Sequence, residues 1–299
     1  MANYLIAMAT FAGIYGLLAL SLNLIWGLAG MVNLGLAGFF AVGAYASALV
    51  TTALAWPIVL GLIAALAAAG LAGVALTLVT VRLREDYLAI VTLGFAEVVR
   101  LVALNETWLT RGADGISGVP GPFRAALGAQ FNLAYLGFVL AWLAIALLLV
   151  ERLRLSPFGR VLRAIRDDQQ VAAVAGKNVL AIKLKAFAIG AALAGFAGAL
   201  YGHYTSYVAP DMFEPLVTIY VFLALVAGGT GNNRGAVLGA FLLLAVLEGT
   251  RFLAGWAPGL SGAQTAALRE MLVGGLLIVV LLARPRGLLP ERLPAPLKP

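Results

Sequence analysis

The chain of 299 residues contains no cysteine, a single histidine and few charged side chains. Without cysteine it has no disulfide, no thiolate metal site and no thiol nucleophile, and one histidine argues against a histidine-rich metal centre. Only 11% of the residues are charged, whereas 63% are hydrophobic. Because ordinary soluble domains are about 45–50% hydrophobic, this composition excludes a soluble enzyme and predicts a membrane protein.

Charge is also absent from the first part of the chain, where the first charged residue is Arg82. Since no basic residues precede the first apolar run, we expect no cleaved signal peptide and a retained membrane helix. A helix of about 20 apolar residues crosses the bilayer core, so we expect an all-α polytopic membrane protein with about eight to ten transmembrane helices in a single domain, residues 1–299. The predicted spans are residues 5–27, 31–52, 57–81, 87–104, 133–150, 186–207, 214–229, 236–253 and 267–283.

Positive charge gathers in two segments. Residues 152–185 contain eight Lys and Arg against Asp167 and Asp168, and the basic, Pro-rich tail 284–299 contains four against one acidic residue. Under the positive-inside rule both segments face the cytoplasm, which predicts a multi-pass protein of the inner (cell) membrane. Three spans before the first charged residue place the N-terminus outside, whereas a re-entrant segment near Gly30–Gly38 would reverse it.

Glycine, with 35 residues, is abundant and unevenly placed. Residues 27–38 hold too many glycines for a uniform helix, since each costs about 1 kcal/mol relative to alanine. A broken helix at membrane depth needs protein or a water-filled cavity to satisfy its backbone, so this break, with Asn33 and Gly35, points to a translocation path. The segment 228–235 is either a second break, hinting at an internal repeat, or an ordinary interhelical turn. Small residues four apart, which let helices approach closely, recur at Gly190, Ala194, Gly198 and Gly202 and at Gly231, Gly235 and Gly239.

A short cytoplasmic elbow is predicted inside the basic segment. Ser156 followed by Pro157 is a typical helix start, with serine as the N-cap. A second short helix from Gln169 to Ala175 would end at Gly176. The first helix is amphipathic and should rest along the membrane surface. Basic side chains on it either reach lipid headgroups or dock a soluble partner, and the pattern alone favours neither. Its apolar positions are Phe158, Val161, Leu162 and Ile165, and its basic positions are Arg160, Arg163 and Arg166.

Charged residues also lie inside two predicted spans. Glu97 and Arg100 are three apart in the fourth span, and Glu248 and Arg251 repeat this spacing in the eighth. Residues three apart share a helix face, and membrane charges are costly, so each pair is read as an ion pair that lines the path or its outer gate. The alternative is that both pairs lie near the outer interface and extend into it. A carboxylate in a proton-coupled transporter must release and rebind its proton, and an adjacent arginine disfavours this.

An intramembrane enzyme is a further alternative. Its only serious base would be His203, near Tyr201, Tyr204 and Tyr207 at the outer end of the sixth span. The sequence contains neither Gly-x-Ser-x-Gly nor His-Glu-x-x-His. Aromatic residues at a span end are typical of an interfacial belt, so we expect no catalytic residue, metal or cofactor.

Several stretches together resemble a known family. The elbow residues 159–168 read GRVLRAIRDD and are followed by Ala172 to Gly176. Residues 83–95, LREDYLAIVTLGF, and 109–116, LTRGADGI, resemble the family's entry to its fourth span and its outer loop. The region with Asn33-Leu34-Gly35 and Gly43-Ala44-Tyr45 also fits. The family is that of the permease subunits of branched-chain amino-acid ABC importers, of the LivM type.

This resemblance implies a permease that carries leucine, isoleucine, valine or a related solute inward by alternating access. It implies a second related permease subunit, two cytoplasmic ATP-binding subunits and a periplasmic solute-binding protein. The chain has no Walker A pattern, so ATP hydrolysis is expected in the partners. A permease for urea or amides, or a proton-coupled transporter, remains an alternative. The resemblance assigns ATPase docking to Arg160, Arg163, Arg166, Asp167, Asp168 and Gly176.

Overall fold

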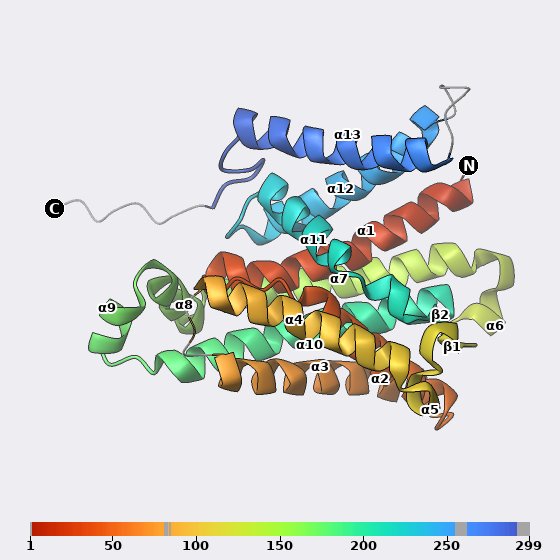
Figure 1. Ribbon diagram of the computed structural model, residues 1–299, viewed down its shortest axis with the longest axis horizontal. Coiled ribbons are helices and arrows are strands. Elements are labelled where there is room, and N and C mark those ends of the chain that lie inside the picture. Colours follow the sequence, from red (N-terminus) through yellow and green to blue (C-terminus); the bar gives the residue numbers. More distant parts are fainter. Residues whose placement is uncertain (1, 81–82, 84, 255–261, 292–299) are drawn as a thin grey trace.

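The computed structural model describes residues 2–80, 83, 85–254 and 262–291. Among these residues, nine helices of 14 to 27 residues form an elongated bundle (Figure 1). Each overlaps one of the nine predicted hydrophobic stretches, which confirms an all-α fold. The helices are α1 (Ala2–Leu22), α2 (Leu36–Thr52), α3 (Ile58–Thr80), α4 (Glu85–Asn105), α7 (Phe131–Leu155), α10 (Val179–Thr205), α11 (Pro215–Gly228), α12 (Asn233–Ala254) and α13 (Gly262–Ala283).

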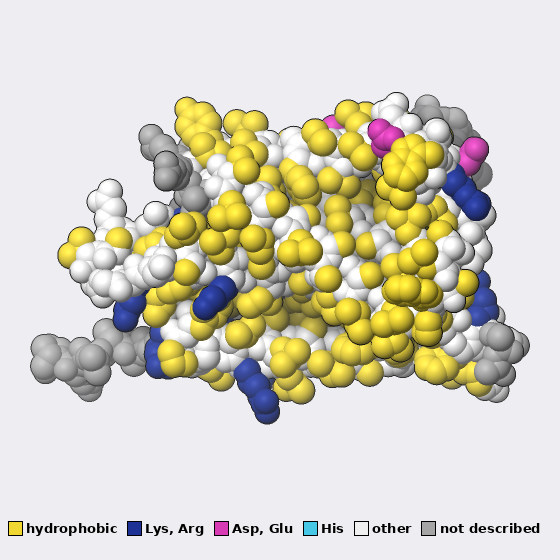
Figure 2. Space-filling model, turned by 90° about the horizontal axis from the view of Figure 1, so that it is seen from below, with side chains coloured by type: hydrophobic (Ala, Val, Ile, Leu, Met, Phe, Trp, Pro, Cys, Tyr) yellow, Lys and Arg dark blue, Asp and Glu magenta, His cyan; other side chains and the backbone are white. Residues whose placement is uncertain are grey.

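The outer surface of the bundle is that of a membrane protein. Hydrophobic side chains cover the middle of the face seen in Figure 2. Within the described part of the chain, six segments are long and apolar enough to cross a membrane, and α2 is a shorter apolar helix. This is a multi-pass architecture with fewer qualifying spans than the predicted eight to ten. The six segments are Asn3–Leu28, Ile58–Thr80, Tyr87–Asn105, Phe131–Leu155, Val179–Thr205 and Pro210–Gly228.

The two ends of the bundle differ. At one end lie the short helices α8 (Pro157–Asp167) and α9 (Gln169–Val174), beside the segment 284–291 that follows α13 (Figure 1). At the other end the connection between α4 and α7 folds into small elements. Its strand β1 (Ile116–Ser117) pairs antiparallel with β2 (Tyr207–Val208). The remaining elements at this end are α5 (Thr107–Thr110), η2 (Gly112–Asp114), α6 (Arg124–Leu127), η3 (Gly128–Gln130) and η4 (Pro210–Phe213).

Helix packing follows the small residues. α10 packs against α2 and α3, and a Cβ at Gly198 would fall on the carbonyl oxygen of Phe40 in α2. A Cβ at Gly239 in α12 would likewise fall on the carbonyl oxygen of Ala224 in α11. Both predicted ladders therefore contain positions where only glycine allows the observed helix approach, which is the expected basis of packing in lipid.

The connection between α7 and α10 is shorter than predicted. α7 continues to Leu155 and α10 begins at Val179, so Arg152, Lys183 and Lys185 lie inside helices rather than in a loop. Long basic side chains can run their apolar stems along a helix surface while the charge reaches water. A basic side chain therefore does not mark the end of a helix here.

Candidate functional site

Local capping builds the elbow as the sequence predicts. The hydroxyl of Ser156 accepts a hydrogen bond of 3.4 Å from the amide three residues later, at the start of α8. The carboxylate of Asp168 accepts bonds of 2.8 and 3.0 Å from two amides in the first turn of α9. α9 stops before Gly176, whose φ of +74° is a left-handed conformation that favours glycine. These caps set a sharp turn between two short helices.

The apolar side of α8 packs on the protein itself. Leu162 and Ile165 are only 0% and 3% exposed. α8 contacts α7, α10 and the π-helical turn η1 (Asn23–Leu28). The prediction that this face rests along the membrane surface was wrong, because an amphipathic pattern shows that one face is buried without showing what covers it.

The three arginines of the elbow point to different surroundings. Arg160 is exposed and Arg163 is half-buried. Arg166 turns inward, where its Nη1 donates to the carbonyl oxygen of Gly27 at 2.6 Å and lies 3.0 Å from a carboxylate oxygen of Glu291. The side chains of Arg166 and Glu291 are 21% and 15% exposed, respectively. We call these contacts the Arg166 latch, because they join the elbow to the end of η1 and to the segment 284–291.

The segment 284–291 is held in place by the end of α11. The amides of Leu288 and Leu289 donate to the carbonyl oxygens of Ala227 and Gly228, both at 2.9 Å. Carbonyl groups in the last turn of a helix have no partner within that helix, so these bonds satisfy them and position Glu291. The tail beyond it, residues 292–299, lies outside the described residues.

A buried polar cluster lies behind the latch. The side chain of Asn23 accepts a bond from the amide of Gly231 and donates one to Asn233, both at 2.8 Å. Asn233 in turn donates to Glu151 at 2.7 Å, and Glu151 forms a two-bond ion pair with Arg154. The cluster ties η1, α7 and the start of α12 together, and it joins η1 to the segment 228–235. That segment is an ordinary interhelical turn between α11 and α12.

A polar cavity of about 460 Å³ adjoins this cluster. Acidic and basic residues both line it, together with three residues of the segment 284–291. The lining residues are Glu151, Arg154, Gly231, Asn232, Arg234, Leu289, Pro290 and Glu291.

The predicted break of the first hydrophobic stretch is present. η1 ends at Leu28 and α2 begins at Leu36, so the residues between them leave the helix. Side chains from other helices satisfy the exposed backbone, because the amide of Leu34 donates to Thr92 of α4 and that of Ala37 donates to Thr218 of α11, both at 3.0 Å. This agrees with the rule that irregular backbone at membrane depth needs partners from the protein.

Asn33 and Gly35 lie at the centre of this break. The side-chain oxygen of Asn33 accepts a bond of 2.9 Å from the amide of Gly35. The Asn33 Nδ2 is buried, and within the described part of the chain it has no hydrogen-bond partner. A Cβ at Gly35 would fall on the carbonyl oxygen of Thr92, so α4 approaches the break closely.

The intramembrane charges lie on separate helices. Glu97 and Arg100 of α4 form a two-bond ion pair, with 2.9 and 2.5 Å between their nitrogen and oxygen atoms, and both are partly exposed. Glu248 of α12 accepts a hydrogen bond from the hydroxyl of Tyr4. The side chain of Arg251 lies outside the described residues. α4 packs against α2, whereas α12 packs against α1 and α11, so the two positions have different neighbours.

His203 is a buried structural residue. Its Nδ1 lies 2.7 Å from the carbonyl oxygen of Pro120, which can only accept a hydrogen bond, so Nδ1 carries the proton. Its Nε2 then accepts from the hydroxyl of Ser47 at 2.8 Å. Both ring nitrogens join α10 to its neighbours, which is a role unlike that of a general base open to a substrate.

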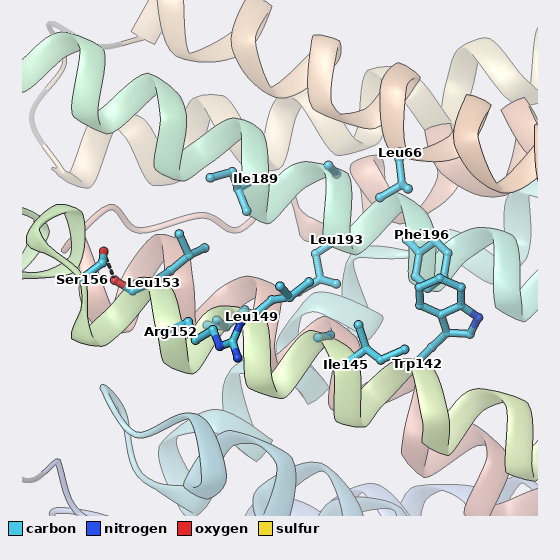
Figure 3. Close-up of a pocket in the computed structure, with 13 residues that line it drawn as sticks. Leu66, Trp142, Ile145, Leu149, Arg152, Leu153, Ser156, Ile189, Leu193 and Phe196 are labelled. Carbon is cyan, nitrogen blue, oxygen red and sulfur yellow. Dashed lines mark hydrogen bonds between the residues drawn. The ribbon is translucent and has the colours of Figure 1, made fainter.

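A second cavity is apolar and lies on the flank of the bundle, between α7 and α10. It has a volume of about 610 Å³. In Figure 3, Trp142 and Phe196 close one end, and Arg152, Leu153 and Ser156 lie at the other. We call this cavity the flank groove.

Comparisons with known proteins match the whole bundle. A family model described as the permease component of a branched-chain amino acid transport system matches residues 4–281. The chain is 35% identical over 313 residues to the high-affinity branched-chain amino acid transport system permease protein LivM of Salmonella typhimurium, covering 96% of this chain and 70% of that protein. It is 31% identical over 322 residues to the probable branched-chain amino acid transport permease protein LivM of Methanocaldococcus jannaschii, covering 94% and 91%.

A second type of permease is also similar. The LivH permease protein of the same Salmonella transport system is 27% identical over 300 residues, covering 94% of this chain and 92% of that protein. No solved structure matches the chain.

Proposed function

The chain belongs to the family of branched-chain amino acid transport permease components, and from this premise we propose that it is the membrane-spanning subunit of an ATP-driven importer. It carries leucine, isoleucine, valine or a related amino acid into the cytoplasm by alternating access. The family match over residues 4–281 carries this proposal. ATP is hydrolysed in two separate cytoplasmic subunits, and a second related permease and a periplasmic solute-binding protein complete the transporter.

The proposed topology has nine crossings of the inner membrane. The elbow and the segment 284–291 lie at the same end of the bundle (Figure 1), and both belong to basic segments. The positive-inside rule then places this end in the cytoplasm and the start of α1 outside. Cysteine-accessibility labelling would test this, because the chain has no cysteine of its own. A cysteine at Lys177 should react only from the cytoplasm and one at Trp108 only from outside.

The elbow is proposed as the ATPase-docking element. It offers exposed Arg160 and half-buried Arg163 to the partner, while Arg166 carries the motion of α8 to η1 through the latch. Asp168 and Gly176 hold the shape of the elbow through their capping positions. Asp167 is exposed and is proposed to contact the ATPase as well.

Charge reversal tests the docking role. We expect Arg160→Glu combined with Arg163→Glu to leave membrane insertion intact and to reduce co-purification of the ATP-binding subunits at least tenfold, because like charges at an interface cost several kcal/mol. Arg284→Glu is the matched control, since Arg284 is exposed at the same end but lies outside the elbow. Normal assembly of the double variant would refute the docking role.

The translocation path is proposed to pass the break between η1 and α2. The unpartnered Nδ2 of buried Asn33 supports this, as does the close approach of α4 at Gly35. Glu97 with Arg100, and Glu248 with Arg251, are proposed as outer gate residues. Asn33→Ala should lower the uptake rate without changing complex assembly, while exposed Asn105→Ala should change neither.

Reconstitution tests the function as a whole. Proteoliposomes with all partner subunits should accumulate radiolabelled leucine only with ATP inside, and the chain alone should accumulate none. Concentrative uptake by the chain alone would refute the proposal. Competition with valine, isoleucine, urea and small amides separates a branched-chain importer from a permease for another solute.

A further inference from the structure

The flank groove has a polarity gradient along its length. Its walls are almost wholly apolar, with Leu66 of α3 above Ile145 and Leu149 of α7 and Leu193 of α10 (Figure 3). One basic side chain, Arg152, lies at the end near the elbow. A long apolar slot that ends in a cation fits an amphipathic anion better than it fits a polar solute.

The dimensions of the groove match one leaflet of a bilayer. Trp142 and Arg152 are ten positions apart on α7, which corresponds to about 15 Å along the helix. The bilayer core is about 30 Å thick, so this distance is half of it. The rings of Trp142 and Phe196 meet edge to face with their centroids 5.0 Å apart, and they close the groove at mid-membrane depth.

Arg152 is free to bind a ligand anion. The neighbouring acidic residue, Glu151, is already bound to Arg154 and Asn233. Arg152 itself is exposed, and its guanidinium makes no hydrogen bond or ion pair with any described residue. Its position in the last turn of α7 places it at the level of lipid headgroups.

We propose that the flank groove binds one acyl chain of a phospholipid of the cytoplasmic leaflet, and that Arg152 binds the anionic headgroup. The leaflet rests on the topology proposed above. The bound lipid fills the space between α7 and α10 next to Ser156, where the elbow begins. Through this contact, the lipid bound in the groove influences the position of the elbow, which is the segment that is proposed to dock the ATPase.

Photolabelling of the assembled transporter tests the proposal without any transport measurement. The complex is placed in nanodiscs that contain trace phospholipid with a diazirine on its acyl chain and either a phosphatidylglycerol or a phosphatidylcholine headgroup. We expect label to concentrate at Ile145, which is 43% exposed, over Leu101 of α4, which is 42% exposed and lies outside the groove. The anionic probe should label Ile145 more strongly than the zwitterionic probe.

Matched variants identify the headgroup contact. Arg152→Gln should lower labelling by the anionic probe about fivefold, which corresponds to about 1 kcal/mol for one cation near an anionic headgroup. Labelling by the zwitterionic probe should hardly change. Lys177→Gln, which removes an exposed cation away from the groove, should leave both unchanged. Because Arg152 is exposed, its replacement is compatible with folding.

Three results would overturn the proposal. The first is equal labelling of Ile145 and Leu101, which would indicate bulk lipid only. The second is an anionic preference that survives Arg152→Gln. The third is a cross-link from Ile145→Cys to the second permease in place of lipid labelling, which would assign the groove to a protein interface. None of these results depends on whether ATP drives uptake, so they are separable from a failure of the proposed function.

Discussion

Replacing Arg166 with glutamine tests whether the elbow is latched to the body of the bundle. The change removes a hydrogen bond of 2.6 Å to the carbonyl oxygen of Gly27, an ion pair of 3.0 Å with Glu291 and a weak contact of 3.3 Å with exposed Asp167. It leaves the hydrophobic contacts of α8 in place, because Leu162 and Ile165 are unchanged. Any loss of stability therefore reports the polar contacts of one side chain.

The magnitude follows from the burial of the pair. Breaking a fully buried ion pair costs about 3–5 kcal/mol, whereas an exposed pair is worth about 0–1 kcal/mol. Arg166 and Glu291 retain 21% and 15% exposure, so water still reaches both charges. We expect Arg166→Gln to lower the free energy of unfolding by about 2–3 kcal/mol, between these two limits.

The assay is equilibrium unfolding of the purified chain in mixed micelles, with a double-mutant cycle. Glu291→Gln should cost less than Arg166→Gln, because Arg166 keeps its bond to Gly27. The double variant should cost less than the sum of the two, with a coupling energy of about 1–2 kcal/mol. Arg163→Gln is the control and should stay within about 0.5 kcal/mol of the unchanged chain. The latch is refuted if Arg166→Gln costs no more than this control, or if the two losses simply add.

Three further predictions concern packing, buried polarity and coupling. Gly198→Ala should destabilise the fold by about 1–3 kcal/mol because its Cβ would collide with α2, whereas Gly94→Ala, which meets open space, should not; thermal unfolding compares them. Asn23→Ala leaves the amide of Gly231 and the side-chain oxygen of Asn233 without a partner and should cost about 2–4 kcal/mol in the same assay, whereas Asn105→Ala on the exposed surface should cost little. Glu97→Gln keeps an oxygen that can accept a hydrogen bond from Arg100, so it should change ATP-driven uptake little, and an uncoupler should not abolish that uptake; a collapse of uptake in the variant would instead indicate a proton relay.

The positions of the long helices could be predicted because hydrophobicity is a property of each stretch by itself. The break after Leu28 was predicted for the same reason, since the density of glycine in residues 27–38 is a local signal. The start of α10 was placed seven residues too late, because Lys183 and Lys185 looked like part of a loop. In the structure Lys183 reaches Gln169 of the elbow at 2.5 Å while its backbone stays helical.

The candidate site was only partly predictable. The caps of the elbow, at Ser156 and Gly176, involve neighbours within a few residues and were read correctly. The partner of Arg166 was missed, because Glu291 is 125 positions away and looked like a lone acid in a basic tail. The asparagines of the buried cluster carried a signal, since an amide inside an apolar span needs a partner, but nothing local identified which one.

The sequence by itself determined that this protein is helical, that it lies in a membrane, where the elbow turns, and to which family the chain belongs. The tertiary structure decided which polar groups meet: Asn23 with Asn233, 210 positions apart, and Arg166 with the carbonyl of Gly27, 139 positions apart. The physical reason is that the free energy of transferring a helix into lipid is a sum over its own residues, whereas a hydrogen bond needs two groups within about 3 Å of each other. That distance is set by how closely the helices approach, and small residues such as Gly198 control this approach.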